Sequence, residues 1–196
     1  MTKNLLAAAA IPLLFLAGCS STEPGATQTA VGTQTPQVSE TAFLEPFGLD
    51  GGDPREIVAV LDQTNDDREK GIVGSVRYDH VVFTTEEGEQ KVPLADDDFY
   101  LSLAPYVDQT HECYYHNLAS CQGELVGEDM DVTITSADGE VLVDETVTTY
   151  DNGFVGFWLP RDIEGTVEVA FDGKSVVAPI ATGPEDPTCV TTLQLT

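Results

Sequence analysis

The sequence predicts an α+β protein, in which a small N-terminal helix-plus-hairpin unit is followed by an antiparallel β-sandwich. Two observations support this fold class. A helix start at Asp53 is followed by runs rich in Val, Tyr and Phe, and the second half of the chain alternates short apolar strands with Asp-Gly and Asn-Gly turns. The 196 residues suffice for one or two small domains with a hydrophobic core.

The N-terminus has the pattern of an exported lipoprotein. Lys3 precedes an apolar run over residues 5–17, which ends in Leu16-Ala17-Gly18-Cys19. This run is too short for a membrane-spanning helix, and small residues before a cysteine are typical of a lipoprotein signal peptide. We therefore expect a signal peptide over residues 1–18 and lipidation of Cys19, which would anchor the protein to the membrane. The alternative is a plain secretory signal in which Cys19 is incidental.

Residues 19–42 are predicted to form a disordered tether. They are rich in Ser, Thr, Gln and Pro and contain almost no large apolar side chains. Such a segment cannot bury enough apolar surface to fold, so it would hold the folded part of the chain away from the membrane.

The chain is strongly acidic, with 34 Asp and Glu residues against 8 Lys and Arg residues and a formal net charge of -26. Such a charge repels nucleic acid and anionic membrane surfaces, so no nucleic-acid partner is expected. It also concentrates cations mildly around the protein, but it does not by itself build a specific site. The acidity is interpreted as a solubility property spread over exposed loops.

The first predicted element is a short amphipathic helix. Asp53 is a typical N-cap, and Pro54 occupies the first helical position. Apolar residues then repeat at the spacing of one helical face, at Ile57, Val60 and Leu61. The helix is expected to run to about residue 64.

Two apolar runs are expected to form a β-hairpin after the helix. The first spans residues 73–85, the second spans residues 90–94, and a glycine-containing turn sequence separates them. Helix and hairpin together give a predicted N-terminal unit over residues 43–97. A unit of this size is only marginally stable by itself, so packing against the rest of the chain or against a second copy is expected. In the apolar segment 99–107 that follows, Pro105 favours an edge strand or a turn over a central strand.

The predicted C-terminal domain, residues 98–196, reads as short strands separated by turns. Asp138-Gly139, Asn152-Gly153 and Asp172-Gly173 supply the positive φ angles that two-residue hairpins require. We expect an immunoglobulin-like or transthyretin-like β-sandwich with Trp158, Val167, Val169 and Phe171 in its core; an open barrel of the same strands is the alternative. The expected strands span residues 132–135, 140–143, 146–150, 154–159, 166–171, 175–180 and 190–195.

Residues 111–121 concentrate side chains that bind metals, namely His111, Cys113, His116 and Cys121. Thiolate sulfur and imidazole nitrogen favour soft or borderline metals, and cysteine-rich sets favour Cu(I), Zn(II) or iron-sulfur centres. The chain has four cysteines, so if Cys19 is lipidated only Cys189 remains to join this motif. We expect a copper site, for Cu(I) in the first place, with zinc as a surrogate.

The spacing of the ligands limits the local conformation. Cys113 and Cys121 would be about 27 Å apart in an extended chain and about 12 Å apart in a helix. Two cysteines that bind one ion have Cα atoms no more than roughly 10 Å apart. The chain is therefore expected to turn back at residues 117–120. A zinc knuckle is disfavoured, because the sequence contains no Cys-x2-Cys pair.

Cysteines of exported proteins also form disulfides. Three thiols would remain after lipidation, so at most one bridge can form and one thiol is left over. A structural disulfide with an incidental free cysteine is therefore an alternative to a metal site. A reversible redox bridge, for example between Cys121 and Cys189, could also compete with the metal.

Three motifs carry a resemblance to a known family. They are His-Glu-Cys113-Tyr-Tyr-His116-x4-Cys121-x-Gly-Glu, the segment 152–160 and the segment 188–193. Together they resemble the CueP family of periplasmic copper-binding proteins, from about residue 43 to the C-terminus. The resemblance implies that Cys113, Cys121 and Cys189 are the copper-binding thiols, with His111 and His116 nearby. It also implies a two-domain protomer, a homodimer formed through the N-terminal part, and copper donation to a Cu,Zn superoxide dismutase.

The expected function is that of a copper-binding carrier and not of an enzyme. The protein would be extracytoplasmic and tethered to the membrane, in the periplasm or on the outer face of a Gram-positive membrane. It would sequester or carry Cu(I) for copper resistance or for delivery to a cuproenzyme. Two other classes stay open: a thiol-based redox protein or metal reductase acting on Cu(II) or Fe(III), and a structural β-sandwich module with a disulfide.

Overall fold

A computed structural model of the chain describes residues 41–49, 52–65, 67–118 and 120–196, which all lie in one compact unit. The predicted signal peptide, the lipidation site Cys19 and the predicted tether up to residue 40 lie outside the described residues. Within the described part, the chain is mostly β-structure, and almost all strand pairs are antiparallel. No helix in this part is both long enough and apolar enough to cross a membrane.

The helices come first in the described chain: a 3-10 helix η1 (Ala42–Phe47), α1 (Pro54–Asp62) and α2 (Asp67–Lys70). Helix α1 begins as predicted, because the Asp53 side chain accepts a hydrogen bond of 2.9 Å from the backbone N–H of Arg55. Its buried face differs from the prediction. Val60 is 50% exposed, whereas the buried side chains are Ile57, Val58, Leu61 and Asp62.

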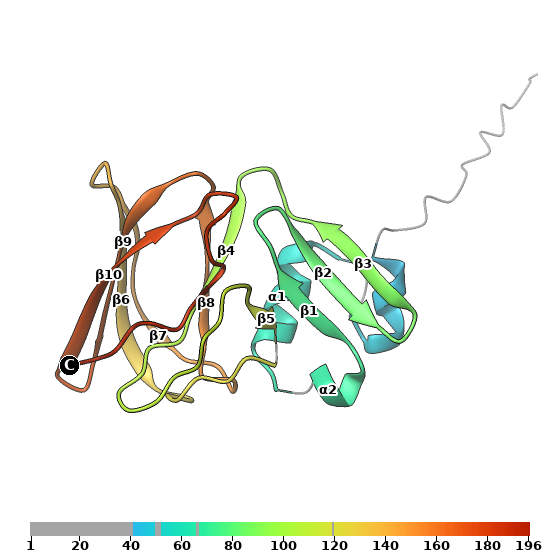
Figure 1. Ribbon diagram of the computed structural model, residues 1–196, viewed down its shortest axis with the longest axis horizontal. Helices are drawn as coiled ribbons and strands as arrows, with labels where there is room; N and C mark the ends of the chain where they lie inside the picture. Colours follow the sequence, from blue (N-terminus) through green and yellow to red (C-terminus); the bar gives the residue numbers. More distant parts are fainter. Residues whose placement is uncertain (1–40, 50–51, 66, 119) are drawn as a thin grey trace, which may run out of the picture. The chain divides into compact units, whose positions relative to one another are not determined.

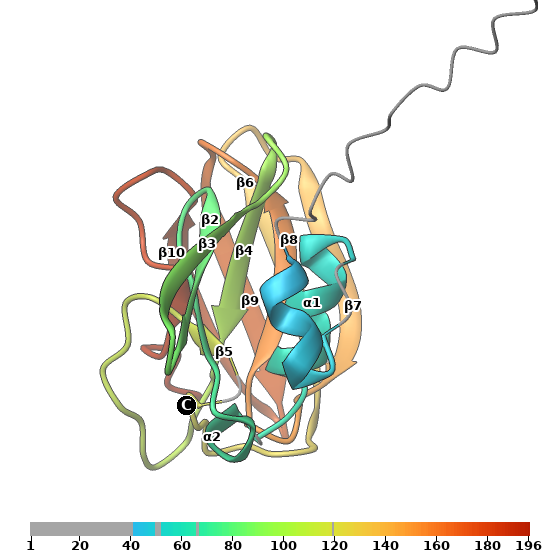
Figure 2. The same cartoon turned by 90° about the vertical axis from the view of Figure 1, so that its right-hand side faces the viewer.

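The first sheet has the strand order β3-β2-β1-β5. The predicted strand over residues 73–85 is in fact two antiparallel strands, because the chain reverses where the Arg77 N–H donates to the His80 carbonyl at 2.8 Å. A hairpin turns at residues 86–87 and joins β2 to β3. In Figures 1 and 2, η1 and α1 lie on one side of this sheet, and their apolar residues share one buried cluster with it. The strands are β1 (Val73–Val76), β2 (His80–Thr85), β3 (Gly88–Pro93) and β5 (Asn117–Leu118).

Two further sheets have the orders β10-β9-β6-β7 and β11-β4-β8. One large apolar cluster contains side chains from both sheets, as in a β-sandwich. Of the predicted core residues, Val167 and Val169 are fully buried within this cluster, whereas Phe171 packs at its margin. The immunoglobulin-like or transthyretin-like assignment stays a prediction. The strands are β4 (Asp98–Leu103), β6 (Asp129–Ser136), β7 (Val141–Thr148), β8 (Val155–Pro160), β9 (Glu164–Phe171), β10 (Lys174–Ala181) and β11 (Cys189–Val190).

Strand β4 corrects the prediction of an edge strand. It is the central strand of its sheet and is buried along its whole length, and Pro105 lies beyond its end. Its alternate side chains face different cores: Phe99 belongs to the sandwich cluster and Tyr100 to the cluster of the first sheet. Figure 1 accordingly shows β4 and β8 between the strands β6, β9 and β10 and the strands β1, β2 and β3.

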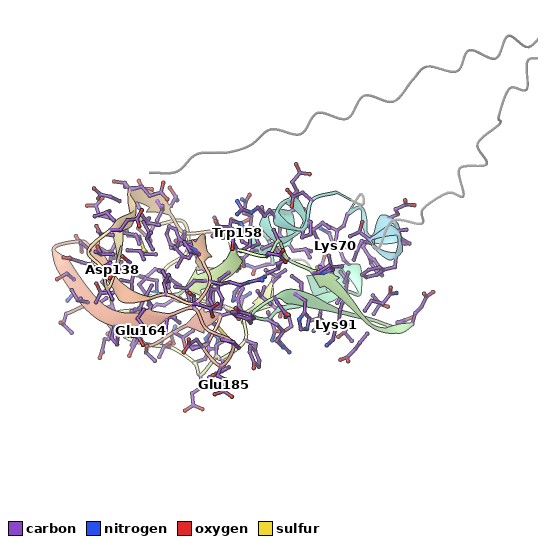
Figure 3. All side chains as sticks on the ribbon, turned by 90° about the horizontal axis from the view of Figure 1, so that it is seen from above. Lys70, Lys91, Asp138, Trp158, Glu164 and Glu185 are labelled. Carbon is purple, nitrogen blue, oxygen red and sulfur yellow. A yellow bond between two sulfur atoms is a disulfide. The ribbon has the colours of Figure 1, made fainter. Side chains whose placement is uncertain are left out.

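Trp158 of β8 also packs toward the cluster of the first sheet and not toward the predicted sandwich core. Figure 3 shows it near the middle of the described part, between Asp138 and Glu164 on one side and Lys70 and Lys91 on the other. The predicted domain boundary at residues 97–98 stays a prediction. Strand β5, which follows that boundary in the sequence, completes the first sheet.

Two of the three predicted turns are hairpins. Asp138-Gly139 joins β6 to β7, and Asp172-Gly173 joins β9 to β10 with positive φ at both residues. Asn152-Gly153 is not a hairpin turn, because β7 and β8 belong to different sheets. The Asn152 side chain is instead fully buried, where it donates hydrogen bonds to Asp62.

Candidate metal centre

The structure brings the three predicted sulfur ligands together. Cys113 and Cys189 form a disulfide across a sequence separation of 76 residues, with Cα atoms 5.7 Å apart. Cys121 is free and buried, and its Sγ lies 3.6 Å from Cys113 Sγ. The three cysteines form one small cluster with Ala104 and Phe154.

The bridge differs from the pairing of Cys121 with Cys189 that the sequence analysis gave as an example. Strand β11 runs parallel to β4, and the Cys189 N–H donates to the Tyr114 carbonyl at 3.2 Å. Cys189 is thereby fixed beside the backbone next to Cys113. The spacing of the cysteines in the sequence does not predict this disulfide, because the disulfide depends on where β11 packs.

The predicted turn between Cys113 and Cys121 is present. The Cys121 N–H donates to the Asn117 carbonyl at 3.1 Å, and the Asn117 N–H lies 3.4 Å from Cys121 Sγ. Asn117 pairs with Ser75 of β1, so the turn is attached to the first sheet. This attachment places the Cys121 sulfur next to the bridge.

The two histidines of the motif have different environments. His111 is exposed, whereas His116 is fully buried with its ring centroid 4.7 Å from that of Phe154. Each histidine belongs to a set of three whose ligand atoms lie within 4.8 Å of one another. The sets are His111, Cys113, Cys121 and His116, Cys121, Cys189.

Asp62 is the residue at this site that the sequence analysis missed. It is fully buried at the end of α1, and its Oδ1 lies 2.6 Å from His116 Nε2. Its other oxygen accepts a hydrogen bond of 2.5 Å from the Tyr100 hydroxyl. The signal in the sequence was a carboxylate directly after Leu61 on the apolar face of the helix, since buried carboxylates are rare unless they have partners.

Asp62 and His116 form a buried ion pair. Burial opposes the charge on His116, but the charge of Asp62 and its hydrogen bond outweigh this effect and raise the pKa of His116 from 6.5 to about 9. Burial also opposes the charge on Asp62, yet the charge of His116 holds the pKa of Asp62 below its usual value. His116 Nδ1 is buried and has no partner at hydrogen-bond distance, although the nearby Cys121 thiol also helps to raise the pKa of His116. A metal ion that bound there would displace the Nδ1 proton.

The donor set fits a soft metal ion. Sulfur and imidazole donors at these separations can reach one ion, given metal-ligand bonds of about 2.0–2.3 Å. Each set of three contains one cysteine of the Cys113–Cys189 bridge. Binding through thiolates therefore requires that the bridge be reduced first.

A comparison with protein families gives a match over residues 56–194 to the family described as periplasmic copper-binding protein CueP. The chain belongs to the CueP family. The resemblance drawn from the three motifs is thus confirmed, and copper is the metal that this family binds. Asp62 and all five predicted ligand residues lie within the matched range.

A solved structure supports the same assignment. The crystal structure of S.CueP is 40% identical in sequence, with a TM-score of 0.76, and the match covers 81% of this chain and 98% of that one. No match was found among curated proteins. The CueP fold therefore extends over nearly all of the described residues.

Proposed function

We propose that this CueP-family chain binds Cu(I) through the thiolates of Cys113, Cys121 and Cys189, with His116 or His111 completing the coordination. The observation that carries the proposal is the convergence of the three sulfurs in one cluster. These cysteines come from segments as far apart as β11 and the loop that precedes β5. Such convergence favours a metal site over incidental cysteines.

The chemistry requires two steps. A dithiol reductant first donates two electrons and two protons to the Cys113–Cys189 bridge and becomes a disulfide itself. The three thiols then lose protons as they bind Cu(I), since the thiolate is the ligand form. Affinity should therefore weaken as the pH falls. Zinc could serve as a surrogate metal for the same donors.

In the cell, this site would sequester Cu(I) for copper resistance or carry it to an envelope cuproenzyme such as a Cu,Zn superoxide dismutase. The predicted lipid anchor at Cys19 would keep the carrier at the membrane, and a homodimer is expected. These finer points are supported by the N-terminal sequence pattern and by the family resemblance.

The test is an anaerobic titration of the reduced chain, expressed without residues 1–18, with Cu(I) against a competing chelator. In this unlipidated chain Cys19 would be a fourth thiol, so Cys19→Ser is included and the only thiols left are Cys113, Cys121 and Cys189. We expect one Cu(I) per chain and a large loss of affinity in each of Cys113→Ser, Cys121→Ser and Cys189→Ser. Unchanged affinity in all three variants would refute the proposal.

A thiol-based metal reductase is the second candidate. The observation that favours it is the free Cys121 sulfur, 3.6 Å from one sulfur of the bridge. Two thiols could reduce two Cu(II) ions to Cu(I), releasing two protons and forming the disulfide, which a dithiol would then reduce again. Reduction of many Cu(II) ions per chain with excess dithiol would support this function. Reduction that stops after two Cu(II) ions per chain would support the carrier.

A further inference from the structure

Asp62 connects helix α1 to the candidate metal centre. Both of its carboxylate oxygens are engaged, one by His116 and the other by Tyr100. Asn152 adds two hydrogen bonds from its Nδ2, at 3.0 Å to Asp62 Oδ1 and at 2.7 Å to the Asp62 backbone carbonyl. A carboxylate with this many buried partners has one fixed orientation.

We propose that Asp62 is a positioning residue of the copper site, which holds His116 through Nε2 so that Nδ1 is the nitrogen presented to Cys121 and Cys189. The inference rests on the proposed function, and it adds a residue that lies outside the cysteine-histidine motif. Asp62 itself does not touch the metal.

The geometry leaves Nδ1 as the ligand atom. A ring nitrogen of His116 lies within 4.8 Å of the sulfurs of Cys121 and Cys189. Nε2 is 2.6 Å from Asp62 Oδ1, while Nδ1 is buried and without a hydrogen-bond partner. A buried nitrogen without a partner is costly in a folded protein unless a ligand satisfies it.

The imidazole ring is fixed from a second direction. The Phe154 ring packs against His116, and the Phe154 N–H donates to Asn152 Oδ1 at 2.9 Å. Asn152 therefore orients Phe154 with its oxygen and Asp62 with its nitrogen. This arrangement explains why Asn152 is buried at a position where the sequence predicted an ordinary turn.

A carboxylate that accepts from the second nitrogen of a metal-binding histidine fixes the tautomer and the direction of the ring. Removal of such a partner typically weakens metal binding about 10- to 100-fold. We expect an effect of that size here, with no change in the number of Cu(I) ions bound.

The experiment compares Asp62→Asn with the parent protein by chelator competition under the conditions of the Cu(I) titration. Asp98→Asn is the matched control, since Asp98 is also a buried aspartate but pairs with Arg55. We expect Asp62→Asn to bind Cu(I) about 10- to 100-fold more weakly and Asp98→Asn to bind it unchanged. Equal affinities for Asp62→Asn and the parent would overturn the inference.

A double-mutant cycle separates positioning from a general structural effect. If Asp62 acts through His116, then Asp62→Asn should cause no further loss of affinity in a His116→Ala background. An equal loss in both backgrounds would overturn the inference. His116→Ala alone should also weaken Cu(I) binding, and an unchanged affinity in that variant would overturn the inference as well.

A measurement on the unsubstituted protein covers the case in which Asp62→Asn does not fold. Nitrogen-15 NMR of the Cu(I)-loaded protein should show the His116 Nε2 protonated and the Nδ1 resonance shifted by the metal. The opposite assignment would overturn the inference. If instead no Cu(I) binds, or if the cysteine variants bind it unchanged, the proposed function itself fails.

Discussion

The free sulfur of Cys121 lies 3.6 Å from Cys113 Sγ, although Cys113 is bonded to Cys189. A third thiol beside a bridge is the arrangement from which thiol-disulfide exchange proceeds. Exchange among the three sulfurs is therefore possible. The redox state sets how many of them are free thiols, and exchange sets which one is free while the bridge exists.

The first prediction concerns the oxidised protein. In the Cys19→Ser chain purified without reductant, mass spectrometry after alkylation should find Cys113 linked to Cys189 and one free thiol at Cys121. This thiol is only 8% exposed, so it should react slowly in the folded protein and rapidly after denaturation. A bridge that contains Cys121 in most molecules would contradict the observed pairing.

The second prediction concerns stability. The Cys113–Cys189 bridge closes a long loop, with a sequence separation of 76 residues, so it restricts the unfolded chain strongly. Reduction should lower the free energy of unfolding of the metal-free protein by about 2–4 kcal/mol. Urea denaturation with and without reductant measures this difference. Cu(I) added to the reduced protein should restore the loss, because a ligand that binds only the folded state stabilises it.

The third prediction is a pH dependence at a site away from the metal centre. Arg55 Nε donates to Asp98 Oδ2 at 2.6 Å, and this hydrogen bond is the main reason that the pKa of Asp98 lies below its usual 3.8. A carboxylate whose pKa is lower in the folded state stabilises the protein above its unfolded pKa. This contribution is lost as the pH falls through the folded pKa.

The variant Asp98→Asn should therefore be less stable than the parent at neutral pH, by about 1 kcal/mol because Arg55 is half exposed. The difference should shrink to nothing in acid. Urea denaturation of both proteins at several pH values tests the sign. A difference that grows as the pH falls below 3.8 would contradict the assignment.

The fourth prediction concerns the contact between Gly156 and Tyr100. A Cβ added at Gly156 would overlap the Tyr100 hydroxyl, which donates to Asp62. Gly156→Ala should therefore displace Tyr100, cost about 1–3 kcal/mol of stability and weaken Cu(I) binding through Asp62. Tyr100→Phe serves as the comparison, since it removes the hydroxyl without the overlap. Cu(I) affinity in Gly156→Ala equal to that of the parent would contradict this link.

The sequence predicted the parts of the structure that depend on neighbouring residues. The cap at Asp53 and the turns at Asp138-Gly139 and Asp172-Gly173 are local, and the structure has them. The sequence motif over residues 111–121 also indicated which side chains would gather, and the structure brings its two cysteines together with Cys189. That these residues bind copper stays a prediction.

What the sequence could not provide depends on residues far apart in the chain. Asp62 is buried against His116, which lies 54 positions away in the sequence. No local pattern around Asp62 therefore indicates this contact. The disulfide between Cys113 and Cys189 follows from the parallel pairing of β11 with β4. This strand of two residues is too short to show a periodic pattern in the sequence. Pro105 favours an edge strand or a turn only if it belongs to the strand, whereas β4 ends at Leu103 and does not include it.

The position of Trp158 gives the site an optical reporter. Trp158 is the single tryptophan in the sequence, and its ring lies 4.7 Å from the Tyr100 ring and 5.0 Å from the Arg55 guanidinium. The Tyr100 hydroxyl donates a hydrogen bond to Asp62, which pairs with His116, so we expect a shift of His116 to change the surroundings of the indole through these two side chains. Intrinsic fluorescence can thus follow events at the sulfurs without any attached label.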